Sequence, residues 1–163
     1  MLLLLACTGS GPGSFSNGGS AGNNSSWDTA LGECNTANED CGVNSCRGDG
    51  PNMLPGADCL ACHTRGGDRD ADVFTVGGTV YPDWDGVGGG LDGVTVRVTD
   101  AKGKVVEMRS SRAGNFYTEE NLTPPLRAGV ENEFGVIEMD RTVEDGDCNS
   151  CHVCDDEGKI FAP

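Results

Sequence analysis

Histidine is the scarcest chemically versatile residue in this chain of 163 residues, which contains only His63 and His152. Basic residues are also few: 11 Lys and Arg stand against 26 Asp and Glu, which gives a formal net charge of −15. A surface this acidic repels nucleic acid and anionic membrane surfaces, so neither is expected as a partner. Long hydrophobic runs are missing too, and the apolar run that opens the chain is too short to span a bilayer.

Cysteine, in contrast, is abundant, and four of the nine cysteines form pairs that lie directly before the two histidines. The two motifs are Cys59-Leu60-Ala61-Cys62-His63 and Cys148-Asn149-Ser150-Cys151-His152. Two thiols three residues apart and an adjacent imidazole are what covalent haem c attachment requires: each thiol adds to a vinyl group, and the imidazole binds iron. A zinc site or a redox CxxC also uses paired cysteines, but neither accounts for a histidine after both pairs.

The motifs therefore predict two covalently bound haem c groups. Cys59, Cys62, Cys148 and Cys151 would form the thioether bonds, and His63 and His152 would be the proximal iron ligands. No histidine remains for a bis-histidine haem, for a nucleophilic triad or for a distal acid-base group.

The remaining iron ligands must then come from other residue types, and methionine thioether is the first candidate. Met53 lies six residues before Cys59, and Met139 lies nine residues before Cys148. Each could bind the iron of its own motif or of the other motif. Met108 lies in a strand pattern and is expected in the core. Lysine ligation and five-coordinate iron remain open alternatives.

The first residues suggest export. Leu4-Leu5-Ala6-Cys7 resembles the lipobox of a bacterial lipoprotein signal, although the usual positively charged segment is missing. This resemblance implies a lipid anchor at Cys7 as the only membrane contact, and a place in the cell envelope, on the outer membrane or outside the cell. An ordinary secretory signal is the alternative.

Four further cysteines remain after the haem motifs and Cys7 are set aside. In an exported protein an even number suggests two disulfides, and three connectivities are possible. Any complete pairing would tie the N-terminal segment to the segment after the second motif. A metal site made of four thiols is the alternative. These cysteines are Cys34, Cys41, Cys46 and Cys154.

Between the motifs the sequence changes to short alternating runs that predict strands. Residues 94–99 place valines on one face and Thr and Arg on the other, and Asp100 to Gly103 predicts a hairpin turn into residues 104–108. Several short strands with turns between them predict a mainly β fold, a small antiparallel β-sandwich. The other expected strands are 74–76, 79–81, 115–118 and 134–139.

Gly78-Thr79-Val80, Leu91 to Asp100, Gly103-Lys104 and Ala113 to Tyr117 look like the transthyretin-like, carboxypeptidase-regulatory-like fold over residues 73 to 139. With its flanking motifs the chain resembles exported bacterial di-haem c-type cytochromes that carry an inserted β-sandwich. The expected organisation is a lipoprotein signal remnant (1–7), a flexible Gly/Ser linker (8–33), a first haem c segment (34–72), the inserted sandwich (73–140) and a second haem c segment (141–163).

The resemblance implies an electron carrier of the cell envelope or cell surface rather than an enzyme. Its partners would be redox proteins or an extracellular electron acceptor. Two other functions stay open: an enzyme or gas sensor with a five-coordinate haem, and a homo-oligomer such as a haem-lined filament. Because sandwich termini can lie near one another, the two haems are expected to form a close pair that relays electrons.

Overall fold

The computed structural model describes residues 50–65, 71–86, 89–152 and 157–162. Three predictions concern residues outside these ranges: the lipid anchor at Cys7, the linker 8–33 and the disulfides. The cysteines expected to form the disulfides are Cys34, Cys41, Cys46 and Cys154. In the described part the chain is mainly β, and none of its helices is long and apolar enough to cross a membrane. The strands are β1 (Val76–Tyr81), β2 (Thr95–Thr99), β3 (Val105–Arg109), β4 (Asn115–Thr118), β5 (Arg127–Asn132), β6 (Gly135–Glu138) and β7 (Ile160–Phe161).

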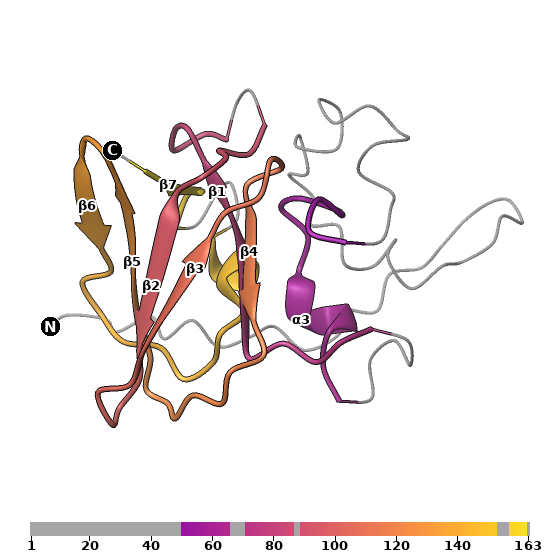
Figure 1. The fold of residues 1–163 in the computed structure, drawn as a ribbon, viewed down its shortest axis with the longest axis vertical. Helices are drawn as coiled ribbons and strands as arrows, with labels where there is room; N and C mark the ends of the chain where they lie inside the picture. The colour runs from indigo at the N-terminus through magenta and orange to yellow at the C-terminus, as the bar shows by residue number, and fades with distance from the viewer. Residues whose placement is uncertain (1–49, 66–70, 87–88, 153–156, 163) are drawn as a thin grey trace, which may run out of the picture.

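The strands form two sheets (Figure 1). The larger sheet is antiparallel and has the order β3-β2-β5-β6. In the smaller sheet, of order β4-β1-β7, β1 is central and pairs antiparallel with β4. The pairing of β1 with β7 is parallel and covers Val80 with Ile160 and Tyr81 with Phe161.

The β2–β3 hairpin forms where the sequence predicts it. Val96 and Val98 are buried, and their neighbours along β2 are only partly buried. Asp100 closes the turn by accepting hydrogen bonds from the backbone N–H groups of Lys102 and Lys104, both at 2.8 Å. Gly103 takes a φ of 81°, a conformation that glycine adopts without steric cost. The alternation and the turn prediction are both confirmed.

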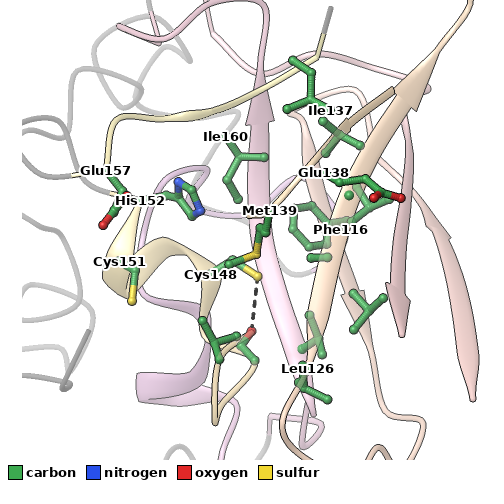
Figure 2. A pocket seen from close by; sticks show the side chains of 18 of the residues that line it. Phe116, Leu126, Ile137, Glu138, Met139, Cys148, Cys151, His152, Glu157 and Ile160 are labelled. Atoms are coloured by element: carbon green, nitrogen blue, oxygen red, sulfur yellow. Dashed lines mark hydrogen bonds between the residues drawn. The ribbon is translucent and has the colours of Figure 1, made fainter. Parts of the chain in front are cut away.

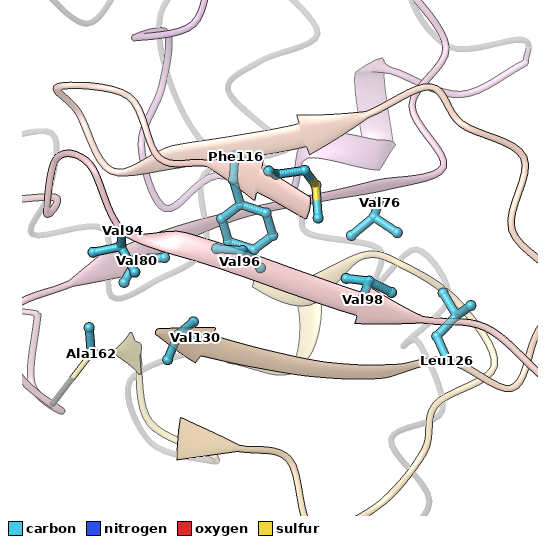
Figure 3. Close-up of a cluster of buried hydrophobic side chains, with 10 residues drawn as sticks. Val76, Val80, Val94, Val96, Val98, Phe116, Leu126, Val130 and Ala162 are labelled. Carbon is cyan, nitrogen blue, oxygen red and sulfur yellow. The ribbon is translucent and has the colours of Figure 1, made fainter. Parts of the chain in front are cut away.

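Side chains from both sheets share one hydrophobic core (Figure 3). Burial of the valines and of Phe116 in this core is the main favourable contribution to folding, at about 25 cal/mol per Å² of apolar surface. Met108 is 8% exposed and belongs to this core, as expected. The core residues are Val76, Val80, Val94, Val96, Val98, Met108, Phe116, Leu126, Val130 and Ala162.

Three features differ from the predicted strands. Of the expected strand 74–76 only Val76 is in a strand, and it belongs with the expected strand 79–81 to one continuous strand, β1, which runs through two glycines. β5 and β7 were not predicted. β5 reads Arg-Ala-Gly-Val-Glu-Asn, a sequence with little strand propensity, and it forms because it pairs along its length with β2 and β6.

The two CxxCH motifs form single helical turns, α3 (Cys59–Cys62) and α4 (Cys148–Cys151). Both turns pack against β1, all of whose residues are buried. A Cβ atom added at Gly77 would lie 2.9 Å from the Cβ of Cys59, and one added at Gly78 would lie 2.9 Å from the Cβ of Cys148. Because successive residues of a strand face opposite sides, the two motifs meet β1 from its two faces.

We predict that Gly78→Ala destabilises the protein, because the new methyl group would lie 2.7 Å from Cζ of Phe116 and against Cys148. The expected loss is about 1–3 kcal/mol of unfolding free energy, as for other overpacked cores. Urea unfolding measures it. As a control, Val105→Ala on β3, where Val105 is 50% exposed, should change stability little. Parental stability of Gly78→Ala would show that β1 does not need a glycine there.

Candidate functional site

Each motif is a helical turn that ends at its histidine. The backbone N–H of His63 donates to the carbonyl of Cys59, and that of His152 donates to the carbonyl of Cys148, both at 2.9 Å. An aspartate precedes each turn: Asp58 caps α3 by accepting from the N–H of Ala61 at 2.8 Å, whereas Asp147 makes no such side-chain cap on α4. One turn of helix thus presents two cysteine side chains and an imidazole together, as the sequence predicts.

Both imidazoles are held through the same ring nitrogen. Nδ1 of His63 lies 2.8 Å from the carbonyl oxygen of Asp72, and Nδ1 of His152 lies 3.0 Å from that of Gly158. A carbonyl can only accept, so Nδ1 carries a proton, and in the neutral ring Nε2 then keeps the lone pair that binds a metal. Burial lowers the pKa of His152, which favours the neutral form that ligation requires.

The second motif opens into a cavity of about 290 Å³ that also reaches the core side chains of both sheets. Cys148, Cys151 and His152 line it together with Met139, and Figure 2 shows these four residues around the cavity. Most of the other lining residues are apolar, among them Phe116, Leu126, Ile137 and Ile160. Two cysteine sulfurs, an imidazole and a thioether beside a mostly apolar cavity are the groups that the predicted haem requires.

The first motif lies at a smaller cavity of about 130 Å³. Cys59, Cys62 and His63 line this cavity with Met53. Each candidate methionine is thus found at the cavity of its own motif, which favours ligation within a motif over an exchange between the two.

The two motifs touch each other through Asn149, which is 5% exposed. Its Nδ2 donates to the carbonyl of Ala57 at 2.7 Å and to Oγ1 of Thr79 at 3.2 Å, and it lies 3.8 Å from Sγ of Cys59. Its Oδ1 accepts from the N–H of Thr79 at 3.0 Å. The fold therefore brings together motifs that are distant in sequence, as the close-pair hypothesis requires.

The thiols of Cys59 and Cys148 both have a raised pKa. Burial, followed by the charge of Asp147, raises the pKa of Cys59 to about 12. Burial also raises the pKa of Cys148, with the nearby Cys59 as the next cause. Reactive CxxC pairs have a lowered pKa, whereas burial raises the pKa of these two thiols. Cys151 is disulfide-bonded in this structure, and that disulfide must be reduced before its sulfur can form a thioether.

The two aspartates that precede the motifs form a carboxyl pair. Burial raises the pKa of Asp147 well above its ordinary value, and its hydrogen bond with Asp58 and the charges of Asp58 and Asp145 raise it further. Among the described residues, Oδ1 of Asp147 is buried and has no hydrogen-bond partner. Sequence reasoning missed this pair, although an aspartate directly before each CxxCH motif was a visible signal.

Other residues at the sites were also missed. Phe74 stacks on His63 and Tyr117 stacks on Phe74, and single-sequence patterns give no signal for such stacking.

Lys159 was missed as well. It lines the larger cavity, and its ammonium group lies 5.4 Å from the centre of the Tyr81 ring. Burial lowers the pKa of Lys159. Within the described ranges no three His, Cys, Asp or Glu side chains gather as a site for a bare metal ion.

Comparison with protein-family models, with curated proteins and with solved structures gave no match to this chain.

We predict that Asp147→Asn stabilises the protein at neutral pH. Folding raises the pKa of this carboxyl above its value in the unfolded chain, which is about 3.9. The contribution of the group to stability is therefore fully present below pH 3.9 and is lost as the pH rises toward the pKa of the folded state. The amide cannot titrate and still donates to Asp58, so we expect a gain of about 1–3 kcal/mol at pH 7.

The measurement is urea unfolding of both proteins between pH 4 and pH 8. Their difference should grow with rising pH, and the variant should show the flatter profile. Asp92→Asn, a change at an exposed carboxylate, is the control and should follow the parent. A variant less stable than the parent at pH 7 would contradict the raised pKa of Asp147.

Proposed function

We propose that this protein is a di-haem c-type cytochrome that carries electrons and has no substrate turnover of its own. One observation carries the proposal: two CxxCH turns, each with its histidine Nδ1 held by a backbone carbonyl, pack on the same strand. An ordinary structural histidine has no need of a cysteine pair in the preceding turn, and here the arrangement occurs twice.

In this proposal Cys59, Cys62, Cys148 and Cys151 hold the two haems by thioether bonds, and Nε2 of His63 and of His152 binds iron. The haem iron supplies one-electron chemistry between Fe(III) and Fe(II). The residues around it fix the ligand orientation, limit water access and set the potential. The backbone carbonyls of Asp72 and Gly158 orient the two imidazoles and raise their basicity.

Met53 and Met139 are the proposed distal ligands, since each lines the cavity of its own motif. A thioether ligand stabilises Fe(II), and six-coordinate iron suits a carrier better than a catalyst. If neither methionine binds iron, the alternative function is an enzyme or a gas sensor with five-coordinate iron.

The finer fold assignment is also a proposal: a transthyretin-like β-sandwich inserted between two loop-rich haem c segments. The shared core of the two sheets supports it. We further propose that the protein acts in the cell envelope or outside the cell, tethered by lipid at Cys7, and exchanges electrons with redox proteins or an extracellular acceptor.

Expression with haem c maturation tests the proposal directly. Intact mass should show two covalently bound haems, and the reduced protein should have the spectrum of low-spin haem c. Replacing Cys148 and Cys151 by alanine should leave one haem, and replacing Cys59 and Cys62 should leave the other. A mass without haem in the parent protein would refute the function.

The distal ligands have a separate test. In the oxidised protein, Met53→Ala and Met139→Ala should each remove the sulfur-to-iron charge-transfer band of one haem, which magnetic circular dichroism detects, and should lower its potential. Met108→Leu, a change at a core methionine, should keep both bands. If both alanine variants retain both bands, these methionines are not the ligands.

A further inference from the structure

A row of three stacked rings leads from the first motif to the surface. The imidazole of His63 lies parallel to the ring of Phe74, with 3.9 Å between centroids and 5° between planes. The ring of Phe74 stacks in turn on Tyr117, at 4.3 Å and 16°. Tyr117 is 41% exposed. The row therefore begins at a proposed iron ligand and ends in solvent.

The backbone holds these rings in place. The N–H of Phe74 donates to the carbonyl of His63 at 2.9 Å, and the carbonyl of Asp72 fixes the His63 ring. Tyr117 lies on β4, where it pairs with Gly77 of β1, the residue on which Cys59 packs. The stack is thus part of the same frame that positions the first motif.

The second motif lacks this feature in the described residues, where no aromatic ring stacks on His152. The remaining described ring pair, Trp84 with Phe161, meets edge to face at 6.1 Å. A stack directed outward from a ligand is therefore particular to the first motif.

The surroundings of the stack are acidic. Asp58 and Asp72 line the cavity that holds His63, Phe74 and Tyr117, and no Lys or Arg lies among its described lining residues. On a chain with a net charge of −15, such a surface attracts cations and repels anions. A partner that reaches Tyr117 should therefore carry positive charge where it docks.

We propose that Phe74 and Tyr117 carry electrons between the first haem and a cationic one-electron partner that docks on Tyr117. This inference rests on the proposed function. In the outward step, one electron leaves the Fe(II) bound by His63, the iron becomes Fe(III), and the partner is reduced by one electron. No bond forms or breaks and no proton moves.

The test uses the protein loaded with both haems. The reduced protein is mixed in stopped flow with tris(1,10-phenanthroline)cobalt(III), a cation that takes up one electron and is a strong enough oxidant for a methionine-ligated haem. Tyr117→Leu and Phe74→Leu should slow oxidation severalfold. The matched controls should not: Tyr117→Phe keeps the ring, and Phe134→Leu removes an aromatic that is 77% exposed elsewhere. Added salt should slow oxidation by this cation and should speed oxidation by ferricyanide, an anion, because salt screens the attraction of the first and the repulsion of the second.

Two further measurements distinguish electron transfer through the rings from a disturbance of the haem site by the substitution. The reduction potentials and low-spin spectrum of Tyr117→Leu should match the parent, because the iron ligands are unchanged. In the ferric parent, proton resonances of the Tyr117 ring should show paramagnetic shift or broadening that is absent in the reduced protein.

The possible failures are distinguishable. Two haems by mass, with equal oxidation rates for Tyr117→Leu and the parent, would overturn this inference alone and place the exchange at a haem edge. Altered potentials in Tyr117→Leu would assign the tyrosine a role in positioning His63 and would also overturn the inference. Absence of haem would overturn both this inference and the proposed function.

Discussion

Close packing on two neighbouring glycines of β1 is the constraint on which the rest of this structure depends. Gly77 accommodates Cys59 on one face of the strand, and Gly78 accommodates Cys148 on the other. With side chains at these positions, neither turn could approach the backbone so closely. The sheet does more than connect the two motifs, because its central strand is the surface on which both are placed.

The two sites have different surroundings as a result. The cavity of the second motif lies among core side chains such as Val96 and Leu126, whereas that of the first motif is bordered by the segment from Gly50 and by exposed Tyr117. The potential of a haem depends on burial and on nearby charge as well as on its ligands. The fold therefore gives two motifs of the same CxxCH pattern different environments.

The sequence predicts the parts of this molecule that local chemistry determines. The two motifs, the alternation of Val96 and Val98, the turn at Asp100 and the place of Met108 in the core follow from spacing and side-chain type. β5 and the stack of Phe74 on His63 do not, because tertiary pairing creates them. The partnership of Asp58 with Asp147 could be suspected from their matching positions, but only the fold brings the two carboxyls together.

Asn149 also bears on how freely the motifs can vary. The two residues between the cysteines of a CxxCH motif take no part in attachment, so chemistry alone leaves them unconstrained. In the first motif Ala61 is exposed and fits that description. In the second motif one of these positions is constrained by the tertiary structure, because the Asn149 amide forms hydrogen bonds with Ala57 and Thr79. Ala61 should therefore tolerate many substitutions and Asn149 few. A motif pattern that treats the two intervening positions as interchangeable would overlook the residue that joins the two sites.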